Sequence, residues 1–84
     1  MIKIYKNITA SAQLKAGFGE LSGFYVNSTT AGTIKIWDSL TGTGTVINNT
    51  ITPAVGFHNL GDVAFNTGCY ITIGGTIDVT FHYK

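Results

Sequence analysis

The sequence predicts an all-β domain, and three observations carry that prediction. Thr, Ile and Val supply 28 of the 84 residues, and these residue types are enriched in strands. They fall in short runs that alternate apolar with polar residues, as a strand with one buried face requires. Clusters of Gly, Asn, Ser and Thr separate the runs about every ten residues, which is typical of strand–turn repeats. We therefore expect one small antiparallel β-sandwich or barrel of about seven short strands.

The expected strands follow these runs in chain order, and one segment stands apart. Residues 9–17 are the only stretch with several residues that favour a helix, but the segment is short and Gly17 can end it. We therefore expect no helix in place of the strands. Pro53 closes the fourth strand because proline cannot donate to a β-ladder. The expected strands are residues 2–8, 21–27, 33–38, 45–52, 62–65, 69–73 and 77–83.

Two apolar runs flank Gly74 and Gly75 and predict a C-terminal β-hairpin. A two-residue loop would mix apolar and polar side chains on each face of the hairpin. A loop with an odd number of residues places the apolar side chains of both strands on one face and the polar ones on the other. We expect a three-residue turn that ends in a left-handed Gly75, or a loop of residues 74–76, which has the same parity. The side chains then expected inward are Cys69, Ile71, Ile73, Ile77, Val79 and Phe81.

The same alternation orients the two strands at residues 21–27 and 33–38, with residues 27–32 as their connecting loop. The inward side chains are Phe24 and Val26 on one strand and Ile34 and Ile36 on the other. Trp37 then faces the opposite way.

Charge is sparse, and this excludes several classes of partner. The chain has nine charged residues, no arginine and a net charge of +1, so it offers no basic patch for nucleic acid. No apolar run approaches the roughly 18 residues that a membrane span needs, and the opening residues do not form a signal peptide. We expect synthesis in the cytoplasm and no membrane partner.

The inventory of reactive side chains does not predict catalysis. His58, His82 and Cys69 do not lie in spacings typical of metal or nucleophile sites. Cys69 is expected inward, as a small inert hydrophobe. Asp38 and Asp62 are expected to form turns, with their side chains bonded to local backbone. We expect no catalytic residue, cofactor, metal or small-molecule substrate.

Aromatic and N-terminal apolar residues are the candidate protein interface. Several aromatic side chains are expected on outer sheet faces, where they favour contact with a partner, although a second core layer is the alternative. Residues 53–60 are expected to be irregular and to present two further candidates. Isoleucines near the start are costly in a free tail. The candidates are Ile2, Ile4, Tyr5, Ile8, Trp37, Phe57, His58, Tyr70 and Tyr83.

Two stretches of sequence resemble a known class of protein. GTIKIWDSLTGTGTVINNTITP (residues 32–53) and GFHNLGDVAFNTGCYITIGGTIDVTFHYK (residues 56–84) resemble small all-β virion proteins of tailed bacteriophages, particularly capsid decoration or cement proteins. The sharpest part is ITIGGTIDVTF, and residues before Ser22 carry no resemblance.

The resemblance implies a structural role on the capsid exterior. A protein of this kind binds across subunits of the major capsid protein and also binds itself, with a trimer favoured. Residues 1–20 would form an N-terminal strand or arm that reaches a neighbouring subunit, and residues 21–84 would form the β domain. Tail, baseplate and head-fibre components share such folds. A carbohydrate-binding β module, with Trp37 or the tyrosines as stacking platforms, is a further alternative.

Overall fold

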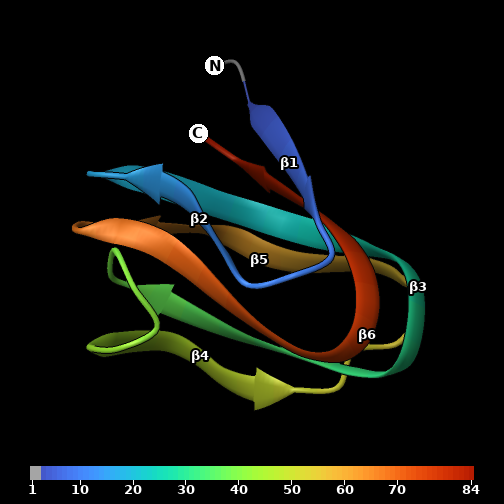
Figure 1. The fold of residues 1–84 in the computed structure, drawn as a ribbon. Coiled ribbons are helices and arrows are strands. Elements are labelled where there is room, and N and C mark those ends of the chain that lie inside the picture. Colours follow the sequence, from blue (N-terminus) through green and yellow to red (C-terminus); the bar gives the residue numbers. More distant parts are fainter. Residues whose placement is uncertain (1–2) are drawn as a thin grey trace.

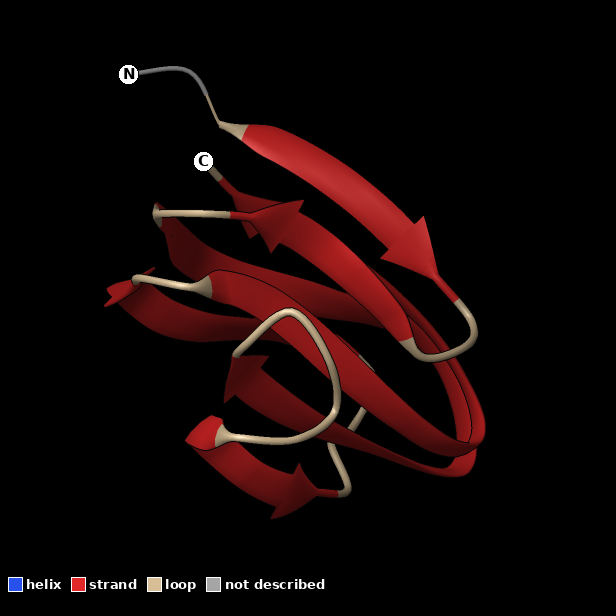
Figure 2. Ribbon diagram, turned by 60° about the vertical axis from the view of Figure 1, so that its left-hand side comes forward, coloured by secondary structure: helices blue, strands red, loops and turns tan. Residues whose placement is uncertain are grey.

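A computed structural model describes residues 3–84 and folds them into six β-strands, with no helix among them. All strand pairs are antiparallel and belong to one open sheet (Figure 1). Figure 2 shows how little of the described chain lies outside strands. The all-β prediction is confirmed, whereas the finer prediction of a sandwich or barrel is not. The strands are β1 (Ile4–Ile8), β2 (Ala12–Ala16), β3 (Gly19–Asp38), β4 (Thr45–Ile51), β5 (Gly56–Phe65) and β6 (Gly68–Tyr83).

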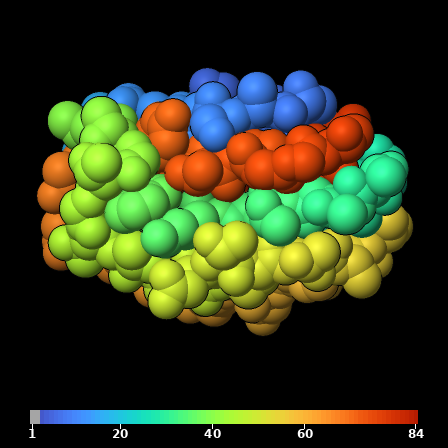
Figure 3. Space-filling model, turned by 60° about the horizontal axis from the view of Figure 1, so that its bottom comes forward, coloured from blue at the N-terminus to red at the C-terminus, as the bar shows by residue number. Residues whose placement is uncertain are grey.

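β3 and β6 form the centre of the sheet, and each runs through both halves of the molecule. Their pairing extends from Leu21 and Tyr83 to Trp37 and Tyr70. The first part of β3 and the last part of β6 lie between β1 and β5, and we call this the β1–β5 half. The other parts lie between β2 and β4, in the β2–β4 half. Figure 3 shows β6 and β3 as adjacent bands, with the N-terminal strands in blue along β6.

Both central strands bend between the two halves, at the right of Figure 1. Residues 21–37 of β3 pair with the shorter stretch 70–83 of β6. The excess residues of β3 are taken up at register shifts near Ser22, between Val26 and Ser28, and at Thr30 and Ala31. Such bulges bend a strand and increase its twist, so they allow the sheet to fold over its own inner face.

The predicted hairpin at Gly74 and Gly75 is wrong. β6 is continuous, and both of its parts pair with β3 and not with each other. The prediction failed because Ile73 and Ile77 are four residues apart, so a continuous strand and an odd hairpin loop place the same side chains on one face. Gly75 does have a left-handed φ of 66°, but inside a bent strand. β3 is likewise continuous through the expected loop at 27–32.

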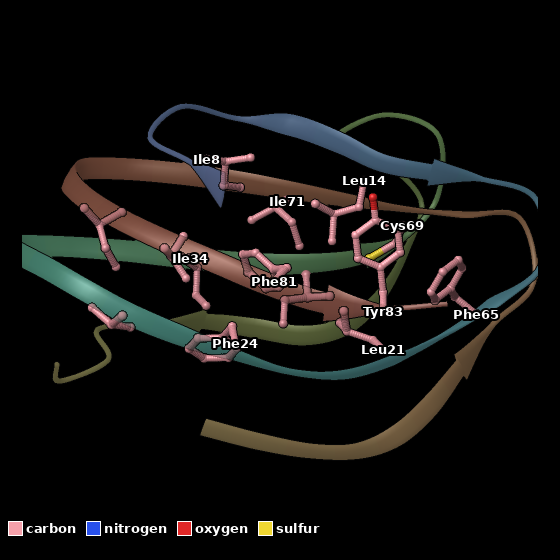
Figure 4. Close-up of a cluster of buried hydrophobic side chains, with 14 residues drawn as sticks. Ile8, Leu14, Leu21, Phe24, Ile34, Phe65, Cys69, Ile71, Phe81 and Tyr83 are labelled. Atoms are coloured by element: carbon pink, nitrogen blue, oxygen red, sulfur yellow. The ribbon is translucent and has the colours of Figure 1, made fainter. Parts of the chain in front are cut away.

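The core lies between the two halves of the folded sheet, and both halves contribute to it (Figure 4). The predicted inward side chains of β3 are buried, and so are those of β6 except Ile73, which is partly buried against the core. The largest fully buried side chains include Phe24, Phe65 and Phe81. A core of this kind is the main source of stability in a chain this small.

The N-terminal residues contribute two strands to the same sheet. β1 and β2 both pair with β6, and they place Ile8 and Leu14 in the core. The segment that holds β2 is therefore a strand, which the sequence did not indicate. Ile2 lies outside the described residues. Contact of residues 1–20 with a neighbouring subunit stays a prediction. Removal of the residues before Gly17 would take away Ile8 and Leu14 and expose the core.

β5 is longer than the strand expected at residues 62–65, because it begins at Gly56. It includes Phe57 and His58, which were expected in an irregular stretch. A bulge at residues 60–62 breaks the alternation there and hides the strand in the sequence. β4 ends at Ile51, before the buried Pro53, close to the predicted end.

Candidate functional site

A groove of about 570 Å³ lies on the outer face of the β1–β5 half. All four strands of that half border it. β1 supplies Tyr5, β3 supplies Ser22, β6 supplies His82, and β5 supplies Phe57, Asn59 and Asp62. The groove thus brings together three candidates from the sequence: Ile4 and Tyr5 of β1, and Phe57, which lies far from them in the chain.

The Phe57 ring lies against the outer face of β3 at Gly23, which has no side chain. Gly23 pairs with His82 on one side and Asn59 on the other. A Cβ atom at Gly23 would lie 2.5 Å from the His58 carbonyl oxygen and 2.9 Å from Cζ of Phe57, so a side chain cannot fit without displacing backbone. The Phe57 ring instead reaches toward His82, with ring centroids 6.0 Å apart and planes 25° apart.

A bulge directs polar groups into the same groove. Between two register pairs, β3 has the single residue Ser22 while β5 has residues 60–62. Gly61 and Asp62 have left-handed φ angles of 69° and 57°, which is uncommon for a residue with a side chain. Asn59 Oδ1 accepts a hydrogen bond from the Gly61 amide at 2.8 Å, and Ser22 Oγ donates to Asp62 Oδ1 at 2.6 Å. These bonds hold a strained conformation in place.

Asp62 is a carboxylate with a lowered pKa. The hydrogen bond from Ser22 is the main cause, and the positive charge of Lys3 adds to it. Lys3 Nζ lies 3.6 Å from Asp62 Oδ1, and both side chains are about half exposed, so this ion pair contributes little to stability. The groove therefore contains one negative and one positive charge.

The outer face of the β2–β4 half carries Trp37 and Tyr70, but it is covered. Lys35 Nζ lies 4.4 Å from the centroid of the Trp37 ring, and Trp37 Nε1 donates a hydrogen bond to Thr72 Oγ1 at 2.9 Å. The loop at residues 39–44, prominent in Figure 2, passes over this face. A Cβ atom at Gly42 would lie 3.4 Å from Cε2 of Tyr70.

The other interface candidates are distributed between core and surface. Ile8 and Tyr83 are 5% and 6% exposed and belong to the core. The outer-face prediction was wrong for Tyr83, because it has the same phase as Phe81 and pairs with the buried Leu21. Ile4 is exposed. His58 is half-buried and stacks on Phe24 with centroids 4.9 Å apart.

A second apolar surface lies at the end of the molecule that gathers the turns, at the left of Figure 1. Phe18 is 63% exposed and Leu40 is 45% exposed. The Gly17 amide bonds to the Thr67 carbonyl, and Leu40 Cδ2 would lie 2.9 Å from a Cβ atom at Gly68. Both segments thus lie against the start of β6, and we call Phe18 and Leu40 the turn end. Sequence reasoning missed it, although a phenylalanine between two glycines was a signal.

Cys69 and Asp38 behave as structural groups. Burial raises the pKa of the Cys69 thiol to about 12, which fits the predicted inert hydrophobe. Desolvation opposes ionisation of Asp38, but hydrogen bonds from the amides of Asn66, Thr67 and Gly68 outweigh it and lower its pKa. Asp38 therefore holds the turn between β5 and β6.

Within residues 3–84, no cluster of three or more His, Cys, Asp or Glu side chains could hold a metal ion. No membrane-spanning helix is found in that part of the chain. Comparison of the chain with protein-family models, with curated proteins and with solved structures gave no match.

Proposed function

We propose that this chain is a non-enzymatic structural protein of a tailed-phage virion, a decoration protein that binds across subunits of the major capsid protein on the capsid exterior. The observation that carries the proposal is a surface with much apolar and little charged area. Nine of the 84 residues are charged, while large apolar side chains are exposed, and such surfaces mark contact sites. The exposed side chains are Ile4, Tyr5, Phe18, Tyr25, Leu40, Val55 and Phe57.

The turn end is the surface that we assign to the capsid. Phe18 stands beside a hollow of about 150 Å³ that is bordered by Lys15, Glu20 and Lys84. Lys84 and Glu20 form an ion pair at 3.1 Å. An apolar centre with a charged rim is the usual anatomy of a protein interface. Simultaneous contact with several subunits would stabilise the shell by mass action and multivalency.

Self-association into a trimer belongs to the same proposal, because symmetric assembly places several turn ends on one lattice position. Light scattering of the purified chain measures this directly. A mass near three chains is expected, and a monomer at working concentrations would contradict the trimer.

Quantitative mass spectrometry of purified virions tests the role itself. A copy number equal to, or a simple fraction of, that of the major capsid protein is expected. A ratio of a few per cent would assign the chain to the tail, baseplate or a head fibre, and absence from the particle would refute a virion role.

Matched phenylalanine variants test the surface. The double variant Phe18→Ser with Leu40→Ser should bind at least tenfold less to phage heads that lack this chain, measured by co-sedimentation. Phe57→Ser is the control, since Phe57 is also exposed but lies in the groove. Equal loss in both variants would contradict the assignment to the turn end.

A further inference from the structure

We propose that the groove of the β1–β5 half is a binding site for an uncharged oligosaccharide. This inference goes beyond the structural role and does not rest on it. Three independent features of the groove lead to it: two exposed aromatic rings, a strained and hydrogen-bonded set of polar groups, and a balanced charge.

The aromatic rings supply apolar area on two sides of the groove. Tyr5 is 74% exposed and Phe57 is 53% exposed, and the two belong to the opposite edge strands of this half. The C–H face of a sugar ring is flat and apolar, so it is removed from water when it stacks on an aromatic side chain. Both rings line the groove together with Ser22, Asn59 and His82, and such a sugar ring would lie there.

The polar groups supply both donors and acceptors, which sugar hydroxyl groups need. Asn59 and His82 can each donate and accept, and both line the groove. Asp62 uses its Oδ1 atom both to accept the hydrogen bond from Ser22 and to face Lys3. The carboxylate therefore has further lone pairs that can accept hydrogen bonds from a ligand. The left-handed backbone of Asp62 is the strained feature that the bulge maintains, and strain of this kind gathers at functional sites.

The charge of the groove selects an uncharged ligand. Lys3 and Asp62 offset one another across 3.6 Å, so neither an anion nor a polycation gains from the local field. The volume of about 570 Å³ lies inside the range of about 300–1,000 Å³ that small-ligand clefts occupy. A short chain of neutral sugars meets both conditions.

The other outer face does not offer an equivalent site. Trp37 and Tyr70, the platforms that the sequence suggested for a glycan, are covered by Lys35 and by the loop at residues 39–44. Stacking on a sugar would have to displace these contacts. The groove is therefore where the carbohydrate alternative has structural support.

The test is a titration of the ¹⁵N-labelled chain with neutral trisaccharides of glucose, galactose, mannose and N-acetylglucosamine, followed by amide chemical shifts. We expect at least one sugar to shift the amides of Tyr5, Phe57, Asn59 and His82. Phe57→Ala and Asp62→Asn should each weaken that binding at least tenfold. Phe18→Ala, the same substitution at a ring that is also exposed but lies outside the groove, should leave it unchanged.

Four outcomes would overturn the proposal. They are no shift with any sugar, shifts centred on Trp37, equal loss in Phe18→Ala, and tighter binding of sulfated or sialylated sugars than of neutral ones. The copy number in the virion is measured separately, so failure of the glycan site leaves the decoration proposal standing, and the converse also holds.

Discussion

Substituting alanine for Gly32 tests the bend between the two halves of the sheet. Gly32 lies in β3 next to the register shift at Thr30 and Ala31, opposite the part of β6 that contains Thr76 and Ile77. A Cβ atom there would lie 2.5 Å from Cβ of Ile77 and 2.7 Å from the Thr76 carbonyl oxygen, whereas carbon atoms normally approach to about 3.5–4.0 Å. Both obstructing atoms are on or next to the backbone of β6, so no side-chain rotation relieves the contact.

The expected cost follows from two opposing effects. Alanine restricts the unfolded chain and alone would stabilise by about 0.4–1 kcal/mol. The steric conflict forces the strands apart, and overpacking of this kind costs about 1–3 kcal/mol or more. The obstructing atoms belong to β6 at its backbone and cannot move aside, so the steric effect dominates. We expect Gly32→Ala to be about 2 kcal/mol less stable than the parent chain, which lowers Tm by about 8–16 °C in a domain of this size.

Gly42→Ala is the matched control, measured beside Gly32→Ala by thermal and urea unfolding. Its Cβ atom would contact the side chains of Thr72 and Tyr70 at 3.3 Å and 3.4 Å, which can move, while the effect on the unfolded chain is the same. We expect the control within about 0.5 kcal/mol of the parent or above it. If both variants melt within about 2 °C of each other, β3 and β6 do not approach as described and the reasoning about the bend fails.

Three further predictions concern the core and the titratable groups. Phe81→Ala should lose about 3–5 kcal/mol in urea unfolding because its ring is fully buried against Phe24, and a loss under about 1 kcal/mol would contradict the core. Because the pKa of Asp38 is lowered from 3.8 in the folded chain, its carboxylate stabilises the fold above pH 3.8, and this stabilisation is lost as pH falls through the folded pKa. Asp38→Asn should therefore reduce the fall in Tm between pH 5 and pH 2, and an unchanged dependence of Tm on pH would refute this. With a folded pKa of about 12 against 9.0, Cys69 favours the folded state below pH 9 and this preference is lost as pH rises toward 12; the native thiol should react with a disulfide reagent at pH 8 at least a hundredfold more slowly than the urea-unfolded thiol, and similar rates would show an accessible thiol.

The sequence was sufficient to predict which side chains are buried in the central strands. Alternation of period two depends only on the pleat of each strand, so Ile34, Ile36 and Ile71 were placed inward without knowledge of the pairing. The site was only partly predictable. Tyr5 and Phe57 were candidates because they are aromatic, but their meeting in one groove depends on β1 and β5 being neighbours of β6 and β3.

The polar side of the groove was hidden by the bulge that creates it. Ser22 and Asp62 face the groove because one residue of β3 opposes three of β5, and a bulge of this kind leaves no regular period in the sequence. Asp62 was assigned to turn formation, which describes its left-handed backbone but not its place on a sheet face. The local preference of aspartate was therefore enough to predict a turn-like backbone at Asp62. Its position in the groove follows only from the pairing of β5 with β3.

Phase alone cannot distinguish a hairpin from a strand that folds over, and this explains the error at the C-terminus. On β3, the register shifts between Val26 and Ser28 and at Thr30 and Ala31 each add one residue. One added residue would turn the following side chains to the other face, but two restore the original face, so Val26 and Ile34 both point inward. On β6 no residue is added across Gly75. In both strands the inward positions on the two sides of the bend are separated by an even number, as an odd hairpin loop would also require. A hairpin and a bent strand differ in which strand each part pairs with. Both parts of β6 pair with β3 and not with each other. Gly74 and Gly75 therefore allow β6 to lie close to β3 at the bend, and they do not reverse the direction of the chain.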